Sequence, residues 1–335
     1  MTDTLPAFTP EVRQRTAPQY AKLKNFIPAV EWSLVAPVID EINRLKKEKN
    51  ALILAHNYMT PDIFHGVADI VGDSLALARE AVNTTADIIV VCGVHFMAET
   101  VKILNPTKKV LIADLEAGCS LSEGITAADV LELKRQHPGA PVVTYVNTSA
   151  AVKAVTDVCC TSGNALEVVE SLDADEVIFI PDQYLGRNVQ KQTKKKLHLW
   201  QGSCMVHEKF TPSEIRALRA QYGGLTVIAH PECPVPVVEE ADFAGSTAQM
   251  IRYVQDRRPE KIALITECSM ADNVAVNFPD VEFIRPCNLC PHMKKITLPK
   301  ILDALRDELP EVLVDEALIA PARRAIDAML AVKPR

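Results

Sequence analysis

The sequence predicts an α/β protein made of three similar units, each with a short parallel sheet, arranged around one central active site. Three cysteines recur at nearly equal intervals, since Cys119, Cys204 and Cys290 are separated by 85 and 86 positions. A threonine follows each cysteine by seven positions, and these threonines are Thr126, Thr211 and Thr297. Short apolar runs alternate with segments of helical periodicity. A repeat of this kind can bring three thiolates to one axis.

Three short apolar runs in each unit are expected to be strands. Continuous runs rich in valine and isoleucine are typical of parallel strands that are covered on both faces. In the order of the chain, the runs are 51–58, 86–93 and 108–119, then 141–148, 174–181 and 195–204, then 225–232, 260–267 and 281–290.

Helices are expected between these strands. Apolar residues at three-to-four spacing predict a helix before each first strand, at 38–50, 127–137 and 212–222. A second helix in each unit is expected to start at a serine that caps it: Ser74, Ser162 or Ser246. Strands alternating with helices predict parallel sheets with right-handed crossovers.

The division of the chain follows from this repeat. We expect an N-terminal arm (1–35), three α/β units, and C-terminal helices (297–335) that pack back on the first unit. The three units are 36–125, 126–210 and 211–296. The arm is rich in proline, with Pro6, Pro10, Pro18 and Pro28, and is expected to lie over the body of the protein.

Composition narrows the class of protein. A net charge of −7 and a pI near 5.7 argue against a nucleic-acid binder. No apolar run reaches the roughly 18–20 residues of a membrane span, and no secretion signal is recognisable, so we expect a cytoplasmic protein. Nine cysteines, an odd number, then suggest metal binding, catalysis or burial and not a disulfide framework.

The polar residues at the ends of the expected strands predict one shared site, because ligands of open α/β sheets bind beyond the carboxyl ends of the strands. These residues are His56, Asn57, Tyr58, Tyr145, Asn147, His230 and Glu232. The fingerprint of a dinucleotide site, three spaced glycines after a strand, is not found.

Cys119, Cys204 and Cys290 are the candidate metal ligands. They can be plain buried residues, ligands of a zinc ion with a bound water, or ligands of a [4Fe–4S] cluster with one open iron. Sulfur ligation spread over three units favours the cluster. Cys287 falls outside the repeat and is expected to form a disulfide only on oxidation. Packing roles are expected for Cys92, Cys159, Cys160, Cys233 and Cys268.

Other residues are candidates for binding and proton transfer. Helix starts at Ser74, Ser162 and Ser246–Thr247 can form a site for carboxylates or phosphate, or can simply be capped. Glu232 is the best candidate for acid–base chemistry, and Tyr58 and Tyr145 can donate to an oxyanion. His56, His207 and His230 are expected in the site. No role is expected for His65, His95, His137, His198 and His292.

Eight motifs together resemble the quinolinate synthase family over about residues 36–310. They are AHNY (55–58), VGDSL (71–75), YVNTS (145–149), CTSGNA (160–165), GSCMVH (202–207), HPECP (230–234), AGSTAQM (244–250) and CPHMKK (290–295). The resemblance implies three pseudo-symmetric, three-layer α/β/α domains around a central [4Fe–4S] cluster. It says nothing about the N-terminal arm and leaves the role of Cys287 open.

The resemblance also implies an activity and a set of residues. The family condenses iminoaspartate with dihydroxyacetone phosphate to give quinolinate, phosphate and water. By position, Cys119, Cys204 and Cys290 would bind the cluster, and Glu232, Tyr58 and His230 would be catalytic. The implied substrate-binding residues are His56, Ser74, Tyr145, Asn147, Ser162, His207, His230, Glu232 and Thr247. Transient transfer of iminoaspartate from L-aspartate oxidase is a possible partner interaction.

Three alternatives stay open at the level of the sequence. An open-iron hydro-lyase would use the same cluster without forming a carbon–carbon bond. A non-enzymatic iron–sulfur redox sensor would not need Glu232 and the helix-start serines. A zinc-stabilised binding protein would lack the absorbance of an iron–sulfur cluster near ~400 nm.

Overall fold

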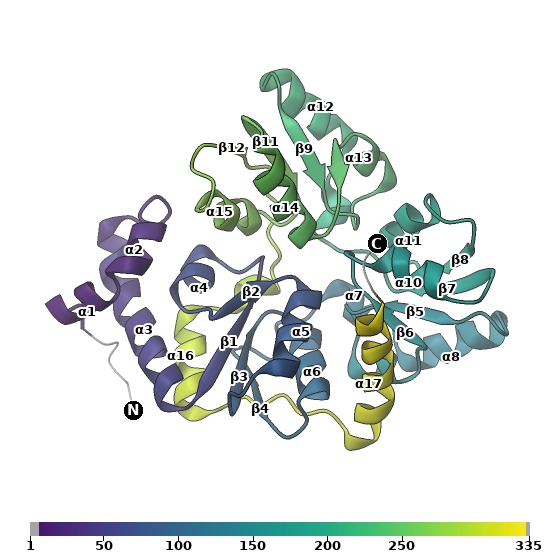
Figure 1. Ribbon diagram of the computed structural model, residues 1–335, viewed down its shortest axis with the longest axis horizontal. Helices are drawn as coiled ribbons and strands as arrows, with labels where there is room; N and C mark the ends of the chain where they lie inside the picture. The colour runs from purple at the N-terminus through teal and green to yellow at the C-terminus, as the bar shows by residue number, and fades with distance from the viewer. Residues whose placement is uncertain (1–6, 333–335) are drawn as a thin grey trace.

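Three four-stranded parallel sheets form the framework of the computed structural model, which describes residues 7–332 (Figure 1). The first sheet has the order β2-β1-β3-β4, and the other two repeat this order as β6-β5-β7-β8 and β10-β9-β11-β12. The strands are β1 Ala51–His56, β2 Ile70–Gly72, β3 Ile88–Cys92, β4 Lys109–Ile112, β5 Val142–Tyr145, β6 Val158–Cys160, β7 Glu176–Ile180, β8 Lys196–Leu199, β9 Thr226–Ala229, β10 Phe243–Ala244, β11 Lys261–Ile265 and β12 Glu282–Ile284.

The predicted α/β class, with three repeated units flanked by helices, is therefore confirmed. Each sheet lies inside one expected unit and appears as one lobe of the molecule in Figure 1. The sequence reading missed the edge strands β2, β6 and β10, which have only two or three residues. Runs this short give no measurable periodicity.

A helix precedes each first strand as expected, but the first one starts at Ala29, earlier than the predicted range 38–50. These helices are α3 Ala29–Glu48, α8 Ala127–Gln136 and α12 Pro212–Gln221. Thr126 and Thr211 cap α8 and α12, and each is in a capping box with an acidic residue three positions on. The repeated threonine therefore starts a helix in the second and third units.

The second helix of each unit begins differently from our expectation. These helices are α5 Ser74–Asn83, α10 Ala165–Ser171 and α14 Thr247–Arg257. Ser246 caps α14 as predicted, but Asp73 caps α5 and Asn164 precedes α10. The side chains of Ser74 and Ser162 are therefore free of the predicted capping role.

The remaining helices connect or cover the sheets. They are α1 Pro10–Arg15, α2 Ala17–Leu23, α4 Pro61–Gly66, α6 His95–Leu104, α7 Ser120–Glu123, α9 Ala150–Ala154, α11 Gln183–Gln190, α13 Val235–Glu239, α15 Ser269–Ala275, α16 Leu298–Asp307 and α17 Glu316–Ala331, with 3₁₀ turns η1 His207–Lys209 and η2 Met293–Lys295. No helix within residues 7–332 has both the length and the apolar character needed to cross a bilayer.

The N-terminal arm is helical where it is described. Helices α1 and α2 pack on α3 and α4, and the start of α3 at Ala29 shows that residues 29–35 are not part of a separate arm. Trp32 and Leu23 are buried, and Arg15 forms an ion pair with Asp40 at 2.7 Å. Pro6 lies outside the described residues.

The two C-terminal helices pack on different units. Helix α16 lies against α3 and β4 of the first unit, as we expected for residues 297–335. Helix α17 instead lies mainly against α9 and β6 of the second unit, with a smaller contact to α6 (Figure 1). The last helix therefore joins two units, which a pattern within one helix cannot predict.

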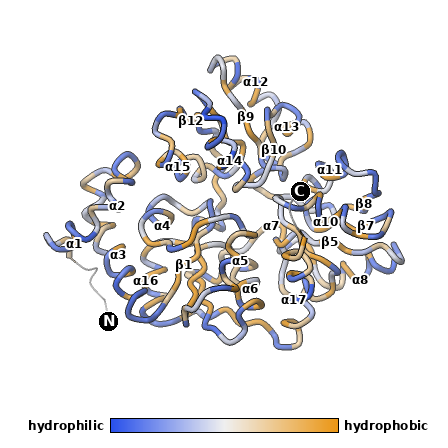
Figure 2. The backbone as a smooth tube through the Cα atoms, viewed as in Figure 1, coloured by the Kyte–Doolittle hydropathy of each residue, from blue (hydrophilic) through white to orange (hydrophobic). Residues whose placement is uncertain are grey.

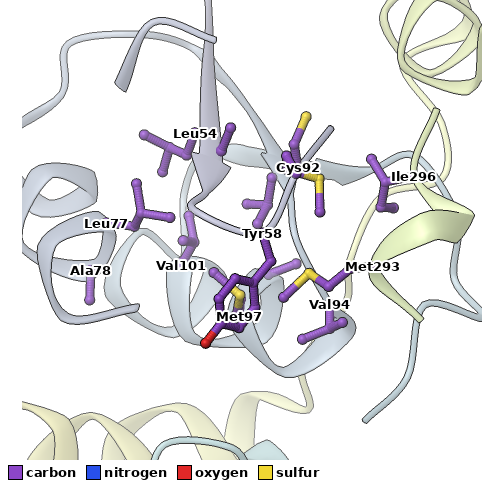
Figure 3. Close-up of a cluster of buried hydrophobic side chains, with 14 of the residues drawn as sticks. Leu54, Tyr58, Leu77, Ala78, Cys92, Val94, Met97, Val101, Met293 and Ile296 are labelled. Atoms are coloured by element: carbon purple, nitrogen blue, oxygen red, sulfur yellow. The ribbon is translucent and has the colours of Figure 1, made fainter. Parts of the chain in front are cut away.

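The cores follow the alternation of apolar strands and amphipathic helices. Figure 2 shows apolar residues along strands such as β1 and hydrophilic residues along outer helices such as α1. All five residues of β3 are buried. Figure 3 shows the ring of Tyr58 beside Met97 in the core of the first unit, while its hydroxyl oxygen extends beyond the apolar cluster.

Candidate active site

The three repeated cysteines line one cavity where the three units meet. Each lies in the loop that follows the last strand of its unit. Cys119 directly precedes α7, while Cys204 and Cys290 each lie three positions before the start of the turns η1 and η2. All three side chains are free and partly buried. The fold therefore brings together three thiols that are far apart in the sequence.

Hydrogen bonds hold these loops to neighbouring units. The Ser120 hydroxyl donates to the Ser203 carbonyl oxygen at 3.1 Å and accepts from the Met205 N–H at 3.1 Å, which joins the first and second loops. In the third loop, the Lys294 ammonium donates to the Tyr58 carbonyl oxygen at 2.9 Å and forms an ion pair with Glu267 at 2.9 Å.

The donors fit a metal group. Burial raises the pKa of Cys119 to about 12 and also raises the pKa values of Cys204 and Cys290. Buried thiols with such pKa values need a cation to become thiolates, as in a metal site. Two buried atoms in residues that line the same cavity, Asn147 Oδ1 and His292 Nδ1, also have no hydrogen-bond partner in the described protein. The cavity thus offers soft sulfur donors and polar atoms that are available to a ligand.

A more compact group of donors lies beside these thiols. One donor atom from each of Cys204, His207 and Glu232 lies within 4.8 Å of the others. Residues 7–332 therefore also contain a set of donors that could hold a single metal ion.

Glu232 is the centre of the polar wall of the cavity. The Tyr145 hydroxyl donates to Glu232 Oε1, and His207 Nδ1 lies 2.8 Å from Glu232 Oε2. Burial raises the pKa of Glu232, but the nearby imidazoles of His207 and His230 and the hydrogen bonds from His207 and Tyr145 outweigh burial and lower it. Glu232 is therefore a carboxylate that is buried but well solvated by protein donors.

Two of the neighbouring imidazoles, His56 and His230, stay neutral at neutral pH. Burial lowers the pKa of His56 to about 4 and that of His230 to about 3. Burial also raises the pKa values of Tyr58 and Tyr145 well above their usual range, so both phenols keep their protons. The wall thus combines one carboxylate with neutral imidazoles and phenol donors.

Hydroxyl groups and helix starts form another side of the cavity. Ser74 and Thr247 are the first residues of α5 and α14, whose N-termini carry free N–H groups. The Ser162 hydroxyl lies 3.1 Å from His230 Nε2, and Asn57 Nδ2 donates to the Thr247 hydroxyl at 2.8 Å. Two helix ends with nearby hydroxyls are suited to anionic groups.

The structure places thirteen of the predicted site residues on this cavity, whereas Asn57 and Ser246 do not line it. The thirteen residues are His56, Tyr58, Ser74, Cys119, Tyr145, Asn147, Ser162, Cys204, His207, His230, Glu232, Thr247 and Cys290. The sequence reading missed Asp73, Glu267 and His292, which also line it. Glu267 ends the predicted strand 260–267, so the rule about carboxyl ends of strands could have found it. His292 had no such signal.

The other cysteines divide into two groups. Cys92, Cys159, Cys160 and Cys233 are fully buried and free, in agreement with packing roles. The packing role predicted for Cys268 is wrong, because Cys268 forms a disulfide with Cys287. The two residues meet because β11 and the third cysteine loop run side by side, as the bridge between Glu267 and Asn288 shows.

Comparison with known proteins agrees with this site. The family model described as "Quinolinate synthetase A protein" matches residues 40–331. The chain belongs to the quinolinate synthase family. It is therefore an enzyme, as the sequence predicted.

Relatives named quinolinate synthase match nearly the whole chain. The protein from Sinorhizobium fredii is 60% identical, and the alignment covers 98% of this chain and 91% of the relative. The protein from Caulobacter vibrioides is 57% identical over 98% of this chain and 90% of the relative. The protein from Xylella fastidiosa is 61% identical over 88% of this chain and 87% of the relative.

Proposed function

We propose that this chain condenses iminoaspartate with dihydroxyacetone phosphate to give quinolinate, phosphate and two waters. The observation that carries the proposal is that three thiols, a buried carboxylate and two helix N-termini line one cavity between the units. These features match what the reaction requires: a metal group, a proton acceptor and sites for carboxylates and phosphate.

Cys119, Cys204 and Cys290 are the residues that would hold a [4Fe–4S] cluster. Three protein ligands leave the fourth iron of such a cluster open, and an open iron supplies Lewis-acid chemistry to a bound substrate. One thiol from each of three units is an arrangement that suits a cluster better than a single ion.

The hydroxyl side of the cavity would hold the anionic groups of both substrates. Ser74 and Thr247, at the N-termini of α5 and α14, would donate to carboxylate or phosphate oxygens. Asn57 holds the Thr247 hydroxyl from the first unit. Ser162, His56 and Asn147 would complete the binding of the substrates from the first and second units.

Glu232 would move protons between substrate atoms. Its carboxylate, held by Tyr145 and His207, would remove a proton from carbon during tautomerisation and return it in a dehydration step. The protonated hydroxyl of Tyr58 would donate to an oxygen that leaves as water, and neutral His230 would orient the reacting group. Burial of these residues excludes water and would protect the labile imine from hydrolysis.

The cytoplasm is the proposed location, because free thiols such as those of the three ligands persist in a reducing compartment. Iminoaspartate, which is unstable in water, would then be transferred from L-aspartate oxidase during a transient contact.

Anaerobic purification with iron and sulfide analysis tests the metal assignment. We expect Cys→Ala changes at 119, 204 or 290 each to abolish the bound iron and sulfide. The matched controls are Cys92→Ala and Cys159→Ala, which remove buried thiols away from the cavity and should keep both. Retention of the full iron and sulfide content after loss of any one of the three cysteines would refute this ligand set.

A substrate-dependence assay tests the reaction. Phosphate release should require both iminoaspartate and dihydroxyacetone phosphate, and the Glu232→Gln variant should lose about 10²–10⁴-fold in rate, as expected when a general base is removed. Dehydration of a hydroxy acid without phosphate release would instead support the hydro-lyase alternative.

A further inference from the structure

A residue that was not predicted as part of the site contacts polar side chains of two different units. Thr266 directly follows β11, is 0% exposed and does not line the cavity. Its hydroxyl lies 2.5 Å from the Tyr58 hydroxyl and 2.9 Å from His207 Nε2. A single hydroxyl of the third unit therefore contacts one polar residue from each of the other two units.

The geometry places this hydroxyl in one chain of polar contacts. A threonine hydroxyl can donate one hydrogen bond and also accept, so Thr266 can serve the Tyr58 hydroxyl and His207 Nε2 at the same time. On the other side of its ring, His207 Nδ1 lies 2.8 Å from Glu232 Oε2 and 3.2 Å from the Cys204 sulfur. Thr266 therefore holds the inner side of the ring whose outer side faces the cavity.

We propose that Thr266 is a positioning residue that orients the Tyr58 hydroxyl and the ring of His207. Within residues 7–332, the other polar neighbour of the Tyr58 hydroxyl is His207 Nε2, at 3.5 Å. That distance is at the limit of a hydrogen bond, so loss of the Thr266 hydroxyl would leave the Tyr58 hydroxyl without a short partner to fix its direction. The inference rests on the proposed function, in which Tyr58 and Glu232 move protons.

Matched substitutions separate the effect of losing the Thr266 hydroxyl from the effect of changing its packing. Thr266→Val keeps the shape and removes the hydroxyl, and Thr266→Ser keeps the hydroxyl and removes a methyl group. Thr100→Val is the control for loss of a buried threonine hydroxyl, because Thr100 donates to the Phe96 carbonyl oxygen within α6. All variants are assayed as holoenzymes, with kcat, KM for dihydroxyacetone phosphate, iron content and melting temperature.

We expect Thr266→Val to lower kcat about 10- to 100-fold, as loss of a partner for buried polar groups predicts. The KM and the iron content should change by less than about twofold to threefold, because Thr266 does not touch the cavity. Thr266→Ser should restore kcat to within about threefold of the wild type, and Thr100→Val should leave kcat unchanged. If the valine variant does not fold, Thr266→Ala takes its place against the serine variant.

A second measurement does not depend on activity. In protein labelled with ¹³C at the phenol carbon of tyrosine, the Tyr58→Phe variant identifies one signal among six tyrosines. Thr266→Val should shift that signal, and Thr100→Val should not. An unshifted signal, full activity of Thr266→Val, or a serine variant as slow as the valine variant would overturn the inference. Absence of quinolinate formation by the wild type would refute the proposed function, while the tyrosine signal would still test the role of Thr266.

Discussion

Replacement of Lys153 by methionine tests how the loop that carries Asn147 is held. Lys153 is 0% exposed, and its ammonium donates to the Val146 carbonyl oxygen at 2.7 Å and to the Thr148 carbonyl oxygen. The two carbonyls flank Asn147, which lines the cavity. Methionine keeps the length and the apolar stem of the side chain but cannot donate to either carbonyl.

The expected loss of stability in Lys153→Met depends on which hydrogen bonds remain after the change. The Val146 oxygen keeps a bond from the Thr148 N–H at 2.8 Å, so only the Thr148 oxygen loses the donor that the ammonium provides. A buried polar group without a partner costs about 1–3 kcal/mol. Removing the ammonium relieves part of this cost, because burial disfavours the charge and lowers the pKa of Lys153. We therefore expect a loss of about 2 kcal/mol.

Thermal unfolding of both proteins at neutral pH provides the assay. A loss of this size should lower the melting temperature by about 3 °C in a chain of this length. The control is Lys191→Met, which removes a lysine whose side chain is 51% exposed and paired with Glu239, and should change stability by less than about 1 kcal/mol. If Lys153→Met is as stable as the wild type or more stable, desolvation of the ammonium outweighs its hydrogen bonds, and the reasoning is refuted.

Three further changes have defined outcomes. Hydrogen bonds from Lys109 and Lys49 lower the pKa of Glu308 to about 2. The stability that this carboxylate contributes is present above its unfolded pKa of about 4.3 and is lost as the pH falls through about 2. Glu308→Gln should therefore cost up to about 1 kcal/mol at pH 7 and much less at pH 2 when unfolding is followed by circular dichroism. Thr211→Ala removes a capping box and should cost about 1 kcal/mol in urea unfolding, with no change in iron content. Gly139→Ala should lower the melting temperature, because Gly139 has φ +87°, whereas an equal melting temperature would show that the turn relaxes.

The sequence predicted those parts of the fold that depend on local patterns. The apolar runs and the capping threonines each depend on a few neighbouring residues, and the cysteines repeat at a nearly constant interval. The three units and the strand-end residues of the site could therefore be found. The disulfide partner of Cys287 could not, because the nearness of Cys268 depends on how β11 lies beside the third loop. The packing of α17 on the second unit and the position of His292 at the cavity could not be predicted either, because both depend on tertiary packing.

The bonds between the cysteine loops have a consequence for the order of folding. Ser120 of the first unit holds the second loop, and Lys294 of the third loop holds Tyr58 of the first unit. A unit that folds alone therefore presents its thiol on a loop without these supports. The complete set of donors exists only after all three units have docked, so the proposed metal group is expected to be loaded last. A group that binds only the docked chain then stabilises the docking itself by mass action.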